Sequence, residues 1–178
     1  MKNNVKDITS IMIVGVGGQG TLLASRILGN VAIKMGYDVK VSEVHGMSQR
    51  GGSVVTYVKY GKDVYSPIID KGEADIILAF EELEAYRALP YAKIDGTMIV
   101  NSQMMDPMPV ITGATTYPEN ILEKLKSKVE VSKLEKGEAY TISFNIVNYS
   151  GSELDTITVA TYFYNNGYDG DTGGHLYF

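Results

Sequence analysis

Residues 11–28 read IMIVGVGGQGTLLASRIL, an apolar run followed by clustered glycines and an apolar-periodic segment. The run predicts a short buried strand over residues 10–14. From Gly18 to about Met35 the pattern is helical, because large apolar residues recur at every fourth position on one face: Leu23, Ile27 and Val31. Gly36 follows at the position where a left-handed residue usually ends a helix.

A second strand is predicted over residues 38–44, where apolar and polar residues alternate in DVKVSEV. Strand, glycine-rich turn, helix and strand form a βαβ unit, so the two strands are expected to be parallel. Further strands are predicted over 53–60, 74–80 and 97–101, and further helices over 81–89 and from Pro118 to about Lys126. These elements predict an α/β fold with a Rossmann-like open, mostly parallel sheet and flanking helices.

The composition changes after about Ser132. Residues 139–147 and 156–164 are rich in Thr and Tyr and flank the turn-prone stretch NYSGSELD, which predicts an antiparallel hairpin. The chain is therefore expected to comprise an α/β domain over residues 1–131 and a β-rich C-terminal segment over residues 132–178.

The composition is that of an ordinary globular protein and argues against several kinds of partner and site. Of 178 residues, 44% are hydrophobic and 21% charged, and the net charge of −5 gives no electrostatic footprint for nucleic acid or an anionic membrane. No apolar run approaches the ~20 residues that span a bilayer, and the N-terminus lacks the apolar region of a signal peptide, so a cytoplasmic protein is expected. The absence of cysteine excludes disulfides, a thiol nucleophile and a cysteine-ligated metal or iron–sulfur site on this sequence.

The glycine cluster satisfies the G-x-G-x-x-G pattern of dinucleotide-binding folds through Gly15, Gly17 and Gly20. In such a turn the first glycine permits the bend, the second permits close backbone approach, and the third permits close packing of helix and strand. A cofactor-binding set is therefore predicted at this loop and at the end of the second strand: Gly15, Gly17, Gly18, Gln19, Gly20 and Glu43. Two alternatives stay open: a tight strand-to-helix turn that binds nothing, and a turn whose only partner is a neighbouring polypeptide segment.

The second strand does not lead into a helix, as it would in a dehydrogenase, but runs through HGMSQRGG (residues 45–52) into another strand. Two glycines after Arg50 leave its guanidinium able to reach outward, and arginine suits bidentate recognition of a carboxylate or phosphate. The alternative is a solvated loop in which Arg50 pairs locally. His45 has no identifiable carboxylate partner in the sequence, so no catalytic residue is assigned.

Four separated motifs occur in one order: GVGGQGTLLASRILGNVA (15–32), SEVHGMSQRGGSVVTYVKYG (42–61), SPIIDKGEADIILAFEELEAYRAL (66–89) and GTMIVN (96–101). Together they resemble the β subunit of indolepyruvate:ferredoxin oxidoreductases and, more broadly, the γ-type subunit of 2-oxoacid:acceptor oxidoreductases. The resemblance extends over about residues 11–131. The segment after it departs from the helix, strand and closing helices expected of family members.

This resemblance implies a subunit of a hetero-oligomer that oxidatively decarboxylates 2-oxoacids, arylpyruvates in the indolepyruvate type, and passes electrons to ferredoxin. It implies that thiamine diphosphate and 4Fe–4S clusters reside on a larger catalytic subunit, and that this chain binds no cofactor firmly and is inactive alone. The 45–52 loop is then expected to line the subunit interface or the entrance to the partner's active site, through His45, Gly46, Ser48, Gln49, Arg50, Gly51 and Gly52. Two other functions stay open: a free-standing nucleotide-binding protein and a non-enzymatic interaction module.

Two further polar groups follow predicted strands. The first is a cluster of glutamates: Glu81, Glu82 and Glu84. We interpret this cluster as the solvated N-terminus of a helix, where carboxylates are favoured. The second consists of Asn101 and Ser102, which are expected to face the same crevice as the glycine loop.

Overall fold

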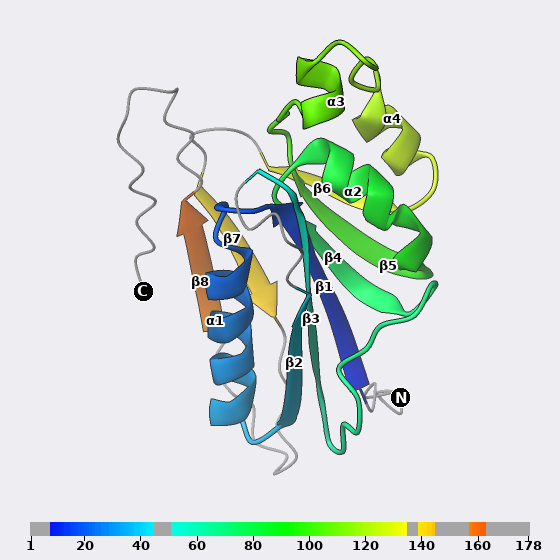
Figure 1. The fold of residues 1–178 in the computed structure, drawn as a ribbon. Helices are drawn as coiled ribbons and strands as arrows, with labels where there is room; N and C mark the ends of the chain where they lie inside the picture. Colours follow the sequence, from blue (N-terminus) through cyan, green and yellow to red (C-terminus); the bar gives the residue numbers. More distant parts are fainter. Residues whose placement is uncertain (1–7, 45–50, 135–138, 145–156, 163–178) are drawn as a thin grey trace. The chain divides into compact units, whose positions relative to one another are not determined.

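The computed structural model describes residues 8–44, 51–134, 139–144 and 157–162 (Figure 1). The chain divides into two compact units, Met1–Lys133 and Leu134–Phe178. Nearly all of the α/β fold lies in the first unit.

The first unit is built around a six-stranded sheet in the order β2-β3-β1-β4-β5-β6. Its strands are β1 (Ile8–Val16), β2 (Asp38–Val44), β3 (Ser53–Gly61), β4 (Ala74–Ala79), β5 (Ala92–Asn101) and β6 (Glu130–Leu134). Strands β1, β4 and β5 run parallel, whereas β3 runs antiparallel to both β1 and β2. Because β1 and β2 therefore point the same way, the predicted Rossmann-like, mostly parallel sheet is confirmed, with β3 as its antiparallel member.

The position of β3 distinguishes this sheet from a dinucleotide-binding fold. Residues 45–52 join β2 to β3 as an antiparallel pair, and β3 then lies between β2 and β1. Strand β2 is thereby an edge strand, two strand spacings or about 10 Å from β1 instead of one. If β2 had been followed by a helix instead of the hairpin strand β3, no strand would have been available to lie between β2 and β1.

The helices cover both faces of this sheet. They are α1 (Thr21–Lys34), α2 (Glu82–Ala88), the 3-10 turn η1 (Leu89–Tyr91), α3 (Met108–Ile111) and α4 (Ile121–Lys126). Alternate residues of β1 point to opposite faces, so Ile11 and Ile13 pack on the α1 side, whereas Met12 and Val14 pack with α2 and α4. Figure 1 shows α1 beside β2, and α2 and α4 together near β4 and β5.

Helix α1 presents a different face to the sheet from the one that the large apolar residues predict. Leu23 is 46% exposed, and Ile27 and Val31 are only half-buried. The residues buried along the helix are small: Thr21, Ser25, Gly29 and Ala32. Their size lets the helix approach the sheet closely, since a Cβ on Gly29 would lie 3.4 Å from Val41 Cγ2. The predicted helix is confirmed, and its buried face is formed by these small residues rather than by Leu23, Ile27 and Val31.

Left-handed backbone conformations set the helix ends. Gly20 (φ 88°) precedes α1 and Asn120 (φ 58°) precedes α4, so both helices begin three residues later than the predicted 18 and 118. Gly36 (φ 85°) follows α1 and confirms the predicted C-terminal position.

Strand β5 begins earlier than predicted because it bulges. Ala74 pairs with Ala92, whereas Ile76 pairs with Thr97, so the chain between these two points loops out of register. Gly96 lies in this bulge, where a Cβ would come within 2.9 Å of the Ala74 carbonyl oxygen. Strand β6 and helix α3 were not predicted; β6 spans the change of composition near Ser132, and α3 is a single turn.

The second unit contains a two-stranded antiparallel sheet of β7 (Ala139–Phe144) and β8 (Ile157–Tyr162). Ala139 lies opposite Tyr162, which confirms the predicted antiparallel pairing. Across the described parts of both units, no helix has the length and apolar character needed to cross a bilayer.

Candidate functional site

The candidate site lies where the parallel strands end. The glycine loop follows β1, Glu81 follows β4, and Gln103 follows β5, so these segments meet at the carboxyl edge of the sheet. The antiparallel β3 begins at this same edge with Ser53. Open α/β sheets place their ligands outside this edge.

The glycines of the loop take roles different from those predicted. Gly18 and Gly20 have φ of 103° and 88° and therefore make the turn. Gly15 instead permits close packing, because a Cβ there would lie 3.1 Å from both Phe80 Cβ and Thr21 Cγ2. The expected roles of the first and third glycines are thus reversed.

Gly17 brings the glycine loop against the start of β3. Its N–H donates to the Gly52 carbonyl oxygen at 2.8 Å, and its own carbonyl accepts from Gly51 N–H at 3.3 Å. The close approach at the second glycine is therefore made by another segment of this chain. Gly51 and Gly52 end the predicted interface loop, whose other predicted residues lie outside the described residues: His45, Gly46, Ser48, Gln49 and Arg50.

Gln19 ties the glycine loop to β4 and to the segment after β5. Its Oε1 accepts from Val16 N–H at 2.7 Å, and its Nε2 donates to Phe80 O and to Gln103 Oε1, both at 3.1 Å. Asn101 Nδ2 donates to the same Phe80 oxygen at 3.1 Å. Asn101 and Gln19 therefore share one acceptor at the carboxyl edge of the sheet. That Asn101 and Ser102 face the same crevice as the glycine loop stays a prediction.

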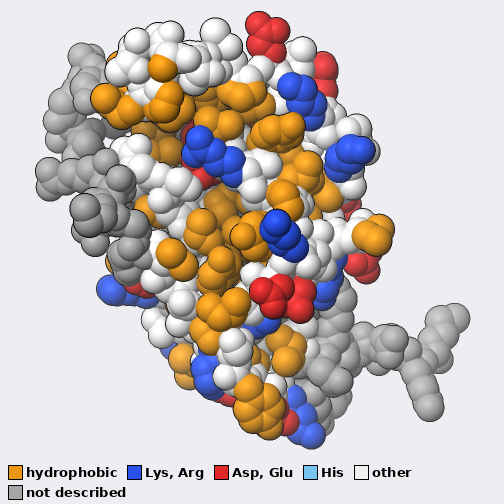
Figure 2. Space-filling view, turned by 45° about the vertical axis from the view of Figure 1, so that its right-hand side comes forward, with side chains coloured by type: hydrophobic (Ala, Val, Ile, Leu, Met, Phe, Trp, Pro, Cys, Tyr) orange, Lys and Arg blue, Asp and Glu red, His pale blue; other side chains and the backbone are white. Residues whose placement is uncertain are grey.

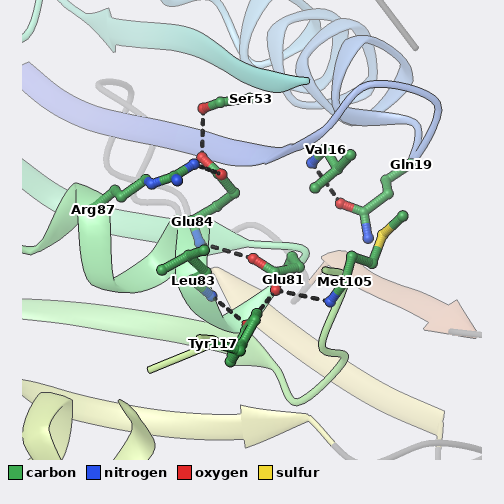
Figure 3. Close-up of polar contacts among 9 residues, drawn as sticks. All are labelled: Val16, Gln19, Ser53, Glu81, Leu83, Glu84, Arg87, Met105 and Tyr117. Carbon is green, nitrogen blue, oxygen red and sulfur yellow. Dashed lines mark hydrogen bonds and ion pairs between the residues drawn. The ribbon is translucent and has the colours of Figure 1, made fainter. Parts of the chain in front are cut away.

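Glu81 is buried at the end of β4, with 1% of its surface exposed. One carboxylate oxygen accepts from Glu84 N–H at 2.9 Å and so caps α2. The other accepts from Met105 N–H at 3.1 Å and from the Tyr117 hydroxyl at 2.5 Å (Figure 3). The Tyr117 hydroxyl accepts in turn from Leu83 N–H at 3.1 Å. A single carboxylate thus joins α2 to the segments that follow β5 and precede α4.

Burial, followed by the hydrogen bond to Glu81, raises the pKa of the Tyr117 hydroxyl well above its ordinary value. The hydroxyl therefore stays protonated at neutral pH and donates to the carboxylate. Because the pKa is raised in the folded state, this group favours the fold below the ordinary tyrosine pKa of about 10, and its contribution falls at higher pH.

Glu84 links α2 to the first residue of β3. The Ser53 hydroxyl donates to Glu84 Oε2 at 2.5 Å, and Arg87 Nη1 donates to Oε1 at 2.5 Å (Figure 3). The three glutamates lie at the N-terminus of α2, as interpreted from the sequence. The expectation that Glu81, Glu82 and Glu84 are solvated there is wrong. All three are buried at this helix end, because donors from neighbouring segments replace water for Glu81 and Glu84.

Glu43 and three of the glycines line one cavity of about 440 Å³ beside the first turn of α1. Its lining includes Gly17, Gly18, Gly20, Arg26, Glu43 and Thr56. Gly15 and Gln19 face β4 instead, so the structure brings together four of the six predicted cofactor-binding residues. Binding of a cofactor there stays a prediction.

Residues 10–147 match the family described as pyruvate ferredoxin/flavodoxin oxidoreductase. The chain belongs to this family. Within the described ranges of this oxidoreductase chain, no group of three or more His, Asp or Glu side chains could hold a metal ion.

Two similar proteins are named indolepyruvate oxidoreductase subunit IorB. The one from Pyrococcus horikoshii is 50% identical over 121 residues, and the one from Thermococcus kodakarensis is 48% identical over 121 residues. Each alignment covers 68% of this chain and 59% of the relative, so the chain spans about three fifths of the relatives' length. The resemblance to this oxidoreductase subunit is confirmed.

A solved structure supports the fold. Pyruvate oxidoreductase subunit PORC from Thermotoga maritima superposes with a TM-score of 0.51 at 18% sequence identity. The match covers 72% of this chain and 62% of that chain.

Several residues of the candidate site are not predicted from the sequence: Ser53, Thr56, Gln103 and Tyr117. Thr56 carries a recognisable signal, because it is the polar residue at an inward position of the alternating strand SVVTYVKY. Tyr117 carries none, since its partner Glu81 is 36 residues away.

Proposed function

We propose that this chain is a subunit of an indolepyruvate-type 2-oxoacid:ferredoxin oxidoreductase and supports oxidative decarboxylation by a larger catalytic subunit. The observation that carries the proposal is the 50% identity to an indolepyruvate oxidoreductase subunit over 121 residues. The comparisons favour this function over a free-standing nucleotide-binding protein and over a non-enzymatic interaction module.

In this proposal, the catalytic subunit binds the redox cofactors. Thiamine diphosphate supplies carbanion stabilisation when bound, and 4Fe–4S clusters need thiolate ligands. This sequence contains no cysteine, so it offers no thiolate ligand for a cluster. Clusters bound by the catalytic subunit would supply the electron transfer from the oxoacid to ferredoxin.

In this proposal, the chain contributes a contact surface for the catalytic subunit at the carboxyl edge of its sheet. The predicted interface loop joins β2 to β3, and its C-terminal end is held twice. Gly51 and Gly52 pair with Gly17, and Ser53 donates to the buried Glu84. We infer that the loop contacts the catalytic subunit, with Arg50 as its ionic anchor.

Arg50→Lys and Arg50→Ala are expected to weaken binding to the purified catalytic subunit by about ten- to a hundredfold, the loss of one charged hydrogen bond. Lysine cannot reproduce the bidentate fork of arginine. If Arg50 acts only at the interface, the melting temperature of the isolated variants should stay unchanged, because the charge of a loop arginine that serves a partner contributes little to folding. Isothermal titration calorimetry against the catalytic subunit measures the affinity.

Lys71→Ala is the matched control, because Lys71 is an exposed cation in the turn before β4, at the opposite edge of the sheet. It should bind like the unchanged chain. Failure of the unchanged chain to bind the catalytic subunit would contradict the proposed function. Normal binding by both Arg50 variants would contradict only the role of the loop.

A further inference from the structure

We propose that the groove between α1 and the β2–β3 edge of the sheet binds a nucleoside diphosphate. This site adjoins the C-terminal end of the proposed interface loop, since Gly17 lines the first cavity and is bonded to Gly52, but its ligand goes beyond the proposed function. It is formed by the cavity of about 440 Å³ beside the glycine loop and by a second of about 710 Å³ farther along α1. Arg26 and Glu43 line both cavities, so the two form one groove.

Two buried hydroxyl groups lie in the first cavity. Thr56 is 4% exposed and Thr21 is 7% exposed, and both residues line the cavity. Within the part of the chain that the structure describes, neither hydroxyl makes a hydrogen bond. A buried polar group without a partner costs about 1–3 kcal/mol. Two such groups on one cavity therefore point to a polar ligand that supplies their partners.

The first turn of α1 gives this cavity an anion-binding end. The helix has neither a side-chain cap nor an acidic residue in its first turn. Its leading N–H groups have no partner within the helix, and its dipole favours negative charge at this end. Arg26, one turn farther along, adds a formal positive charge to the lining. A diphosphate matches this combination of amides, hydroxyls and guanidinium.

The part of the groove beyond the diphosphate suits a nucleoside, and it begins at Glu43, which lines both cavities. Glu43 lies directly opposite Thr56 in the β2–β3 register, and a carboxylate at the end of this strand can accept hydrogen bonds from ribose hydroxyls. The second cavity adds an apolar wall of Val39, Val41 and Ile33 against which a base can pack.

The same geometry argues against a dinucleotide. The Gly17 amide, which approaches the pyrophosphate in dinucleotide-binding folds, is already bonded to Gly52 O. The insertion of β3 also moves Glu43 away from β1, so the groove runs along α1 rather than across the glycine loop. A single nucleotide fits this path.

The test is isothermal titration calorimetry of the full chain, without any partner, against ADP. ADP is expected to bind saturably. Thr56→Val should weaken binding about three- to tenfold, and Arg26→Gln about tenfold or more. Lys34→Gln changes an exposed cation at the other end of α1 and should leave the affinity unchanged.

A second readout separates binding from folding. Without ADP, Thr56→Val should not lower the melting temperature, because valine replaces a hydroxyl that has no partner. A lowered melting temperature of Thr56→Val would contradict the observation that the Thr56 hydroxyl makes no hydrogen bond in the free chain. Absence of ADP binding at about 1 mM, or inorganic pyrophosphate binding as tightly as ADP, would overturn the proposal. Because no catalytic subunit is present, these outcomes are independent of the proposed oxidoreductase function.

Discussion

Glu81→Ala is expected to lower the free energy of unfolding by about 3 kcal/mol, since hydrogen bonds to a charged group contribute about 1.5–3 kcal/mol. The change leaves Met105 N–H, Glu84 N–H and the Tyr117 hydroxyl without their acceptor, all at a site with 1% exposure. For a chain of this size, that loss corresponds to a fall in melting temperature of roughly 6–12 °C. Thermal and urea unfolding of the full chain measure it.

Two further variants test whether the loss of stability comes from the missing carboxylate of Glu81. Glu81→Gln keeps the side-chain volume and one acceptor oxygen, so it should cost less than Glu81→Ala. Glu119→Ala is the control, because Glu119 is exposed and should change the stability by less than about 0.5 kcal/mol. Equal stabilities of Glu81→Ala and Glu119→Ala would mean that the buried carboxylate does not hold the carboxyl edge together.

Gly15→Val is expected to destabilise the chain by about 3 kcal/mol, at the upper end of what overpacking costs. The new Cβ would lie 2.9 Å from Gln19 Oε1 and 3.1 Å from both Phe80 Cβ and Thr21 Cγ2. Gln19 would have to move, which breaks its bonds to Val16 and Phe80. The expected result is a lower melting temperature together with weaker binding of the catalytic subunit.

The matched control is a pair of alanine variants. Gly15→Ala introduces the same short contacts and should be destabilising. Gly29→Ala places its Cβ 3.4 Å from Val41 Cγ2, an ordinary contact, and alanine favours a helix interior by about 0.5–1 kcal/mol. Gly29→Ala should therefore be neutral or stabilising. A Gly15→Ala variant as stable as Gly29→Ala would contradict the packing role of the first glycine.

Local patterns in the sequence predict most of the sheet. Alternation in DVKVSEV gives the bounds of β2, and the apolar run ADIILA gives β4 to within one residue. The order of the strands is harder to predict from the sequence. A hairpin of β2 and β3 can form without β3 also pairing with β1. The double pairing of β3 depends on contacts far apart in the chain, such as Ile13 with Thr56.

The candidate site, too, can be predicted from the sequence only where a local pattern marks its residues. The glycine loop and Glu43 are found from spacing, and the cavity that joins them confirms that they lie close together. The buried glutamates are misjudged because a run of carboxylates ordinarily predicts a solvated surface. Only tertiary structure reveals that Tyr117 and Ser53 supply the donors that allow Glu81 and Glu84 to be buried.

An apolar surface also emerges only from the fold. Figure 2 shows hydrophobic side chains gathered in a band over the face that carries α2 and α4, interrupted by scattered Lys and Arg side chains. The exposed apolar residues of the first unit include Tyr65, Ile68, Tyr86 and Ile94. They are spread along the chain from residue 65 to residue 94, so no local sequence pattern predicts that they form one surface.

The central claim, that this chain is a supporting subunit, is tested most directly by turnover of an arylpyruvate with a viologen electron acceptor. The purified chain is titrated into a fixed amount of the catalytic subunit carrying thiamine diphosphate and iron–sulfur clusters. We expect no turnover and no iron in the chain alone, and a rate that rises with added chain until it saturates. Turnover by the chain alone, or a rate that does not respond to the added chain, would contradict this assignment.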